Sequence, residues 1–227
     1  SKSLGNVVNP DDVIRDYGAD TMRLYIMFIG DFEKAAAWSD ESVRGCKKFL
    51  DRVWNLSEKL KEGADCSPEN EQAIHKAIKK VSSDIEAMKF NTAIAALMAL
   101  VNDFYANGCS KGDMRTLLLL LSPFAPHISE ELWEMLGFAA ETGRMICQMS
   151  WPAYDASKTV ASTVDMAVQV KGKLRGTVTV PVDSEEAAVV EAARQVDKVA
   201  RALEGMEIGK VIHVRSKLVN LIVKPAK

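Results

Sequence analysis

The stretch DMRTLLLLLSPFAPHISEELWEML, residues 113–136, decides the fold class of this chain of 227 residues. Its five consecutive leucines, Leu117–Leu121, are apolar on every side of a helix, which is the pattern of a helix buried all round. The prolines of SPFAP then break the chain, and a further helix is expected from His127 to Leu136 with Leu132 and Trp133 facing inward. Two such helices can bury their apolar surface only against other elements. The stretch therefore predicts a helical bundle.

Three more amphipathic helices precede this stretch, because apolar residues recur at three- and four-residue steps through most of residues 39–107. The first is expected from a cap at Ser39 to about Lys61, the second from Ser67-Pro68, and the third from a cap at Asn91 to Asn107. The leucine-rich helix is expected to begin near Asp113. Together these elements predict a bundle of about five helices over residues 39–152.

Residues 1–38 form a separate segment that begins with a small, polar loop. Asn9 can cap a helix, Pro10 suits its first position, and Asp11 and Asp12 suit the positive end of the helix dipole. We therefore expect a loop that leads into a helix. Because the chain lacks an initiator Met and opens in mid-motif, we expect it to be part of a longer protein.

After Trp151-Pro152 the pattern changes from helical spacing to alternation. Residues 153–163 are small and polar without periodicity, so we expect a linker there. Residues 164–227 predict a compact β-β-α-β-β domain. Its expected elements are strands Ala167–Val170 and Thr177–Val182, a helix of about seventeen residues capped by Ser184, and strands Val211–Val214 and Leu218–Val223. The predicted fold class is mainly α with a small α+β domain.

The formal net charge of −2 hides opposite signs in two parts of the chain. Residues 1–159 carry 18 Lys and Arg against 23 Asp and Glu, a net of −5, while residues 160–227 carry 11 against 8, a net of +3. The small total argues against a protein that coats nucleic acid without selectivity. If any part of the chain contacts phosphates, the C-terminal part is the better candidate.

The cysteines point to neither a metal site nor disulfides. They are widely spaced without a C-x-x-C pair, and no histidine stands at ligand spacing from them, so no metal site is expected. The lack of a secretory signal favours reduced thiols in a cytoplasmic protein. No apolar stretch approaches the roughly 20 residues of a transmembrane helix, so no membrane contact is expected. The cysteines are Cys46, Cys66, Cys109 and Cys147.

Two short stretches could carry chemistry. In the opening loop, Lys2 stands between the hydroxyls of Ser1 and Ser3 and could hold a polyphosphate, although an exposed tail is the commoner meaning of such a hexamer. In residues 171–176, KGKLRG, the three cations Lys171, Lys173 and Arg175 stand with two glycines that let backbone approach a partner. This second stretch predicts either a phosphate contact or a solvated hairpin turn. His127, which follows a proline at a helix start, is expected to be structural.

The opening resembles the end of the KMSKS signature loop of class I aminoacyl-tRNA synthetases, with Ser1-Lys2-Ser3 as its last residues. The continuation, Gly5–Pro10 and then Tyr17–Leu24, is similar to the segment after that loop in the leucyl, isoleucyl and valyl enzymes.

Residues further along resemble the leucyl branch of this family. Three motifs look like its anticodon-binding-type bundle, and the tail is similar to its C-terminal domain. Isoleucyl enzymes tend to end in a zinc-binding cysteine cluster and valyl enzymes in a coiled coil, and the tail of this chain, with Cys147 as its last cysteine, predicts neither. The motifs are Trp38-Ser39-Asp40, Arg52-Val53-Trp54 and Ser122–His127 with Glu130–Trp133, and the tail segments are Val168–Gly176 and Lys217–Asn220.

The resemblance implies a full-length enzyme that condenses leucine with ATP, with magnesium, and transfers the leucyl group to leucine tRNA. Lys2, with Ser1 and Ser3, would bind ATP and stabilise the departing pyrophosphate. The chain alone would lack the nucleotide-binding fold and be inactive, serving as the tRNA-docking part of a monomeric enzyme. Arg215 and Lys217, in the turn of the closing hairpin, join Lys171, Lys173 and Arg175 as tRNA-binding candidates.

Two rival functions remain open at this point. A helical bundle with net negative charge could instead be a protein-interaction module that binds no RNA. The chain could also be the equivalent region of a valyl or isoleucyl enzyme.

Overall fold

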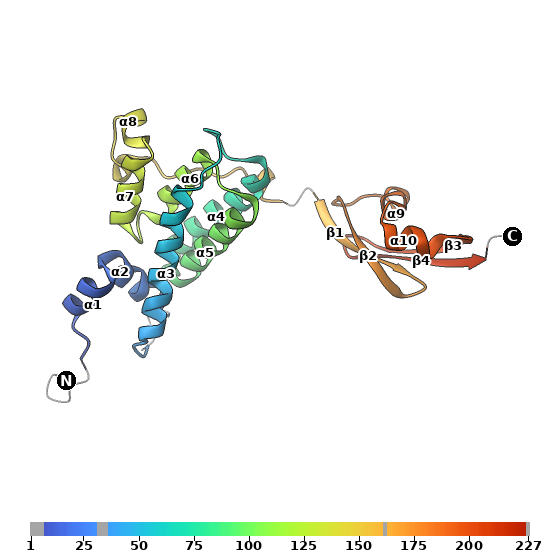
Figure 1. Cartoon of the computed structure of the whole chain (residues 1–227), viewed down its shortest axis with the longest axis horizontal. Coiled ribbons are helices and arrows are strands. Elements are labelled where there is room, and N and C mark those ends of the chain that lie inside the picture. Colours follow the sequence, from blue (N-terminus) through green and yellow to red (C-terminus); the bar gives the residue numbers. More distant parts are fainter. Residues whose placement is uncertain (1–6, 31–35, 161–162, 226–227) are drawn as a thin grey trace. The chain divides into compact units, whose positions relative to one another are not determined.

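The computed structural model describes residues 7–30, 36–160 and 163–225. The chain divides into two compact units, residues 1–159 and residues 160–227, which we call the helical unit and the sheet unit (Figure 1). The elements of the helical unit are α1 (Pro10–Tyr17), α2 (Ala19–Phe28), α3 (Asp40–Ser57), α4 (Pro68–Glu86), α5 (Phe90–Asn107), α6 (Lys111–Leu121), α7 (Pro126–Met135), α8 (Phe138–Thr142) and the short 3-10 helices η2 (Ile146–Gln148) and η3 (Ala156–Thr159).

The leucine run lies at the centre of the helical unit, as predicted. Leu117, Leu118, Leu120 and Leu121 of α6 are 0% exposed, and they belong to one core cluster with residues of α2 to α5 and α7. Trp133 of α7 is also 0% exposed, and its indole Nε1 donates to the carbonyl of Arg144 at 3.1 Å. A buried tryptophan needs such a partner for its N–H. The mainly helical fold class is confirmed.

The helix caps show where local sequence reasoning succeeds. Ser39 Oγ accepts from the backbone N–H of Ser42 at 3.2 Å, and Asn9 Oδ1 accepts from that of Asp11 at 3.3 Å, so both predicted caps are confirmed. The leucine-rich helix begins at Lys111, ahead of the expected Asp113. The reason is a capping box in which Ser110 is the cap and Asp113 its third-position partner.

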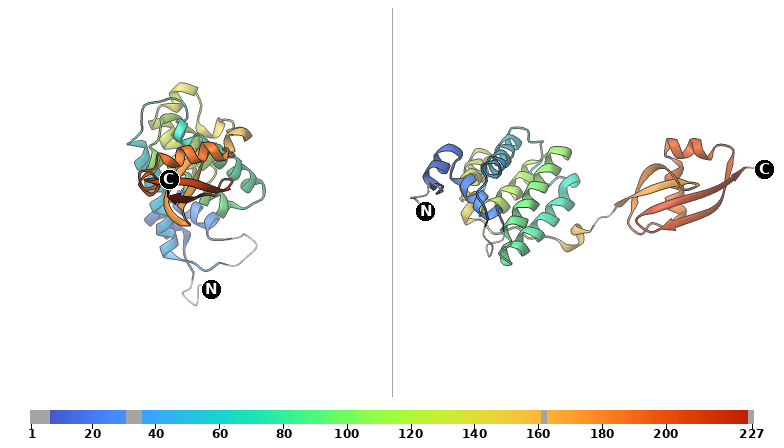
Figure 2. Two further views of the ribbon diagram at one scale, coloured as in Figure 1. Left: turned by 90° about the vertical axis from the view of Figure 1, so that its right-hand side faces the viewer. Right: turned by 90° about the horizontal axis from the view of Figure 1, so that it is seen from below.

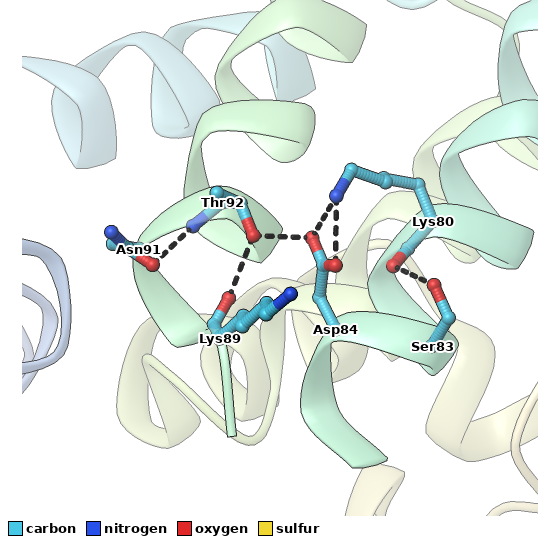
Figure 3. Close-up of polar contacts among 6 residues, drawn as sticks. All are labelled: Lys80, Ser83, Asp84, Lys89, Asn91 and Thr92. Atoms are coloured by element: carbon cyan, nitrogen blue, oxygen red, sulfur yellow. Dashed lines mark hydrogen bonds and ion pairs between the residues drawn. The ribbon is translucent and has the colours of Figure 1, made fainter. Parts of the chain in front are cut away.

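The cap predicted at Asn91 is wrong, because α5 already begins at Phe90 and Asp84 of α4 organises its start (Figure 3). The Asp84 carboxylate accepts from Thr92 Oγ1 and from Lys80 Nζ, each at 2.6 Å. Burial alone would raise the pKa of Asp84, but these hydrogen bonds and the charges of Lys80 and Lys89 outweigh it, and the pKa is lowered.

The sheet unit is one four-stranded sheet with two helices on one face (Figure 2). The strand order is β2-β1-β4-β3, with the inner strands β1 and β4 parallel and the outer pairs antiparallel. The inward residues of alternating strand positions form its core with Val189, Ala193 and Val199 of the helices. The elements are β1 (Thr163–Val170), β2 (Lys173–Pro181), α9 (Glu186–Arg194), α10 (Asp197–Leu203), β3 (Met206–Val214) and β4 (Leu218–Pro225).

The single helix predicted from Ser184 is wrong in two respects. The N-cap is Glu185, since Ser184 Oγ donates to the carbonyl of Pro181 at 2.6 Å. The helix is also broken into α9 and α10 at Gln195-Val196. Val196 packs directly on Gly176 of β2, where an added Cβ would lie 2.8 Å from Val196 Cγ1. The strands lie where expected but are longer.

The boundary between the two units, between Thr159 and Val160, falls within the linker predicted at residues 153–163. Residues 153–159 belong to the helical unit, and η3 packs on α4 within this stretch. Polar side chains of α4 hold the stretch in place, a tertiary effect that composition does not reveal.

Candidate nucleic-acid interface

The candidate catalytic residues Ser1, Lys2 and Ser3 lie outside the described residues. The described part begins at Val7 and enters α1 and α2, which contain most of the Tyr17–Leu24 motif.

Asp20 of this motif joins α2 to the first turn of α7. Its carboxylate accepts from the backbone N–H of Ile128 at 2.7 Å and from that of His127 at 3.4 Å, and lies 2.7 Å from His127 Nδ1. These N–H groups have no acceptor within their own helix, so Asp20 acts as a cap supplied from outside. The acidic residue of the motif and His127 therefore serve packing of α2 on α7, in line with the structural role expected for His127.

The predicted basic turn is a tight hairpin turn between β1 and β2. Lys171 and Gly172 have φ of 50° and 76°, as a two-residue turn with both central residues left-handed requires. Asn220 of β4 fixes the turn, since its Oδ1 accepts from the backbone N–H of Gly172 at 3.0 Å. Lys171 and Lys173 are both exposed. The turn thus presents cations on a rigid backbone.

Arg175 lies in an open groove between the start of β2 and α10. The groove has a volume of about 560 Å³, and Lys198 and Arg201 of α10 line it as well. All three cations are exposed, and the described residues provide none of them with a hydrogen bond or an ion pair. Cations gathered without carboxylates favour an anionic ligand with several charges.

Sequence reasoning missed Lys198 and Arg201. They stand one helical turn apart, and with Arg194 they follow the spacing of one helix face, which was a detectable signal. Their proximity to Arg175 was not detectable, because it depends on the packing of Val196 over Gly176.

Arg215 and Lys217 belong to a different turn, between β3 and β4, and both are exposed. Strand β1 separates β2 from β4, so two strand spacings, roughly 10 Å of backbone, lie between this turn and β2. The structure therefore divides the five candidate cations into two groups, and Arg175 alone joins the groove.

The cysteines are all free thiols. Burial raises the pKa of the Cys46 thiol to about 11 and that of the Cys109 thiol to about 12. The residue Cys66 is exposed overall, but desolvation of its thiol also raises its pKa. Within the described ranges, His, Cys, Asp and Glu form no group of three or more that could hold a metal ion.

None of the helices in the described part of the chain combines the length and apolar character needed to cross a lipid bilayer.

Two family models match the chain. The model described as anticodon-binding domain of tRNA ligase matches residues 71–192, more than half of the chain and parts of both units. The model described as tRNA synthetases class I (I, L, M and V) matches residues 1–39.

Similar proteins cover the chain from end to end. A leucine–tRNA ligase of Alkaliphilus oremlandii is 50% identical over 225 residues, and one of Chlorobaculum tepidum is 44% identical over 232 residues, each covering 99% of this chain. The chain spans 28% of the length of both relatives. A crystal structure of a ternary LeuRS–tRNA–LeuAMS complex from Agrobacterium radiobacter K84 matches 99% of this chain and 31% of its own, with a TM-score of 0.66 and 31% identity. The chain belongs to the tRNA ligase family that carries this anticodon-binding domain, and the relatives that match nearly all of it are leucine–tRNA ligases.

Proposed function

We propose that the chain is the tRNA-docking C-terminal part of a leucine–tRNA ligase, and that its sheet unit binds the backbone of leucine tRNA. The observation that carries the proposal is the groove in which Arg175, Lys198 and Arg201 gather without acidic partners among the described residues. Exposed cations that need no protein partner are free to neutralise phosphates. The relative from Agrobacterium radiobacter K84 that was crystallised with tRNA supports this assignment.

The composition of the sheet unit also favours backbone contacts over base contacts. Residues 160–227 contain no Phe, Trp or Tyr. Unpaired RNA bases are usually held by stacking on aromatic side chains, so this unit lacks the usual means of binding them. Phosphate and sugar contacts would hold the tRNA by its shape, with affinity that falls steeply as salt rises.

The test is the salt dependence of binding to an unmodified leucine tRNA transcript. Arg175→Ala/Lys198→Ala/Arg201→Ala should flatten the slope of log K against log salt by roughly 0.7–0.9 for each phosphate that is no longer neutralised. The variant Lys171→Ala/Lys173→Ala/Arg175→Ala tests the turn in the same way, and Arg215→Ala/Lys217→Ala tests the second turn.

A control is Lys210→Ala/Lys224→Ala, which removes two exposed cations from β3 and β4 of the same sheet, one of which, Lys224, is paired with Glu207 at 3.4 Å. The control should leave the slope unchanged. Equal slopes for all variants would reject the assignment of these cations, and failure of the unaltered chain to bind tRNA would favour the rival protein-interaction module.

In the full-length enzyme we propose a catalytic role for Lys2, assisted by Ser1 and Ser3. As the leucine carboxylate attacks the α-phosphorus of ATP, which would bind with magnesium, negative charge grows on the departing pyrophosphate, and a lysine can bind that state better than ground-state ATP. The chain alone would show no leucine-dependent ATP–pyrophosphate exchange. We further propose a monomeric, cytoplasmic enzyme.

Lys2→Ala in the full-length enzyme should lower the rate constant of leucine activation by on the order of 10²–10³. Transfer of leucine from preformed adenylate should change little, because the pyrophosphate has by then departed. Pre-steady-state measurement of the two half-reactions separates these effects. If transfer suffers as much as activation, Lys2 is a binding or folding residue.

A further inference from the structure

Residues 151–159, which we call the strap, run along one face of α4 in the opposite direction to the helix. The indole Nε1 of Trp151 donates to Ser82 Oγ at 2.8 Å, and the backbone N–H of Asp155 donates to His75 Nδ1 at 3.1 Å. Lys158 Nζ donates to Glu71 Oε1 at 2.6 Å. The three α4 partners are spaced by four and seven residues, which places them on one side of a helix.

The strap has local structure that suits it to this face. The Asp155 carboxylate accepts from the backbone N–H of Ser157 at 2.9 Å and from its Oγ at 2.6 Å, which starts the 3-10 helix η3. That short helix carries Lys158 to Glu71. Tyr154 adds a cation–π contact, with Lys79 Nζ 5.8 Å from the centre of its ring. The strap is therefore docked at successive turns of α4.

The hydrogen bonds between the strap and α4 are all exposed to solvent. The Lys158 and Glu71 side chains are 42% and 43% exposed, and Trp151 is 41% exposed. Exposed ion pairs are weak and screened by salt, and a segment with few buried apolar contacts opens more readily than the core. The core of the helical unit does not depend on the strap, because no strap residue belongs to its buried cluster.

We propose that the strap is a releasable part of the connection between the two units, and that Glu71, His75 and Ser82 are positioning residues that set how far the sheet unit can reach. With the strap docked, only residues 160–162 separate η3 from β1. Release would add residues 151–159 to the connection, about 30 Å of contour at roughly 3.4 Å per residue. A longer connection lowers the effective concentration of one unit near a ligand held by the other. The proposal does not depend on the identity of that ligand.

The test replaces the three residues of α4 that hold the strap and leaves the sequence of the strap unchanged. In the whole chain, Glu71→Ala/His75→Ala/Ser82→Ala should speed hydrogen exchange of the Asp155 amide by about tenfold or more, because its acceptor is removed. Small-angle X-ray scattering should show a larger radius of gyration. A control on the same helix is Glu69→Ala/Lys76→Ala/Ser83→Ala, which changes three exposed residues that form no hydrogen bond or ion pair with the strap among the described residues, and both measurements should stay unchanged.

A charge reversal distinguishes loss of the dock from damage to α4. Glu71→Lys should release the strap, and Glu71→Lys/Lys158→Glu should restore both slow exchange and the smaller radius. Unchanged exchange in the triple variant would show that these residues do not hold the strap. Faster exchange without a larger radius would show that the docked strap does not limit the reach of the sheet unit. Either result overturns the proposal.

Discussion

The buried carboxylates of the helical unit and the groove cations of the sheet unit differ in whether the fold satisfies their charge. In the helical unit, buried carboxylates accept hydrogen bonds from donors of the protein. Asp113 is 0% exposed and accepts hydrogen bonds from the backbone N–H groups of Ser67 and Ser110 and from Asn70 Nδ2. In the sheet unit, Arg175, Lys198 and Arg201 are exposed and have no partner among the described residues. A charge that the fold satisfies belongs to stability, whereas a charge left unsatisfied at the surface is available to a ligand.

Removal of the Asp113 carboxylate should produce the largest effect. Asp113→Ala leaves several buried donors without an acceptor, each at about 1–3 kcal/mol, so we expect a loss of about 3–5 kcal/mol in the free energy of unfolding. Urea unfolding followed by tryptophan fluorescence measures this loss, because Trp38, Trp54, Trp133 and Trp151 all lie in the helical unit. Asp113→Asn, which keeps one acceptor oxygen, should lose less. A loss below about 1 kcal/mol would mean that solvent satisfies these donors.

Asp84 should give a smaller, pH-dependent effect. Its pKa is lowered in the folded state, so its stabilisation is present above the unfolded pKa, near 3.9, and is lost as pH falls through the folded value. Asp84→Asn should cost about 1.5–3 kcal/mol at pH 7, and the difference from the unaltered chain should shrink at acid pH. The exposed Asp103→Asn is the control and should show neither effect. If the difference in stability between Asp84→Asn and the unaltered chain stayed the same at low pH, the charge of Asp84 would not be the cause of its stabilising effect.

The smallest stability change is expected from the groove cations. Arg175→Ala/Lys198→Ala/Arg201→Ala should alter the free energy of unfolding of the sheet unit by no more than about 0.5 kcal/mol per substitution, because each side chain is exposed and has no partner in the described part of the chain. Hydrogen exchange of the β1 and β4 amides reports on this unit, which has no aromatic residue for fluorescence. Strong destabilisation would show that the cations support the fold, and the contrast between the two units would fail.

The sequence predicts elements whose signal is local and periodic. The apolar residues that recur along one face of α3 and the leucine run of α6 allow both helices to be predicted from the sequence. The cap at Ser39 is predicted correctly because its hydrogen-bond partner is only three residues away. The start of α5 escapes prediction because Asp84 comes from another helix. The break between α9 and α10 escapes it because Val196 meets Gly176 on a neighbouring strand. Contacts between elements that are far apart in the sequence produce no periodic pattern from which they could be predicted.

The same division applies to the candidate interface. The turn at Lys171-Gly172 is visible in the sequence because cations and glycines adjoin. The groove requires α10 to lie over the start of β2, so the sequence offers Arg175 and the helical spacing of Lys198 and Arg201 but not the proximity of the three side chains. The strap is predicted as a linker because its residues are small and polar, and the sequence does not show that α4 provides hydrogen-bond partners for them.

The parallel pairing of β1 with β4 has a consequence for how the sheet unit folds. Ala167 pairs with Leu218, so the two inner strands meet across most of the length of the unit, and this high contact order predicts slow folding. In the bundle, α4 packs on α5, its neighbour along the chain, and this helix pair can form while synthesis continues. The sheet must wait for its final strand to leave the ribosome. Shortening the chain by Leu218–Pro225 would remove an inner strand, and β3 would then be without its only neighbour in the described sheet.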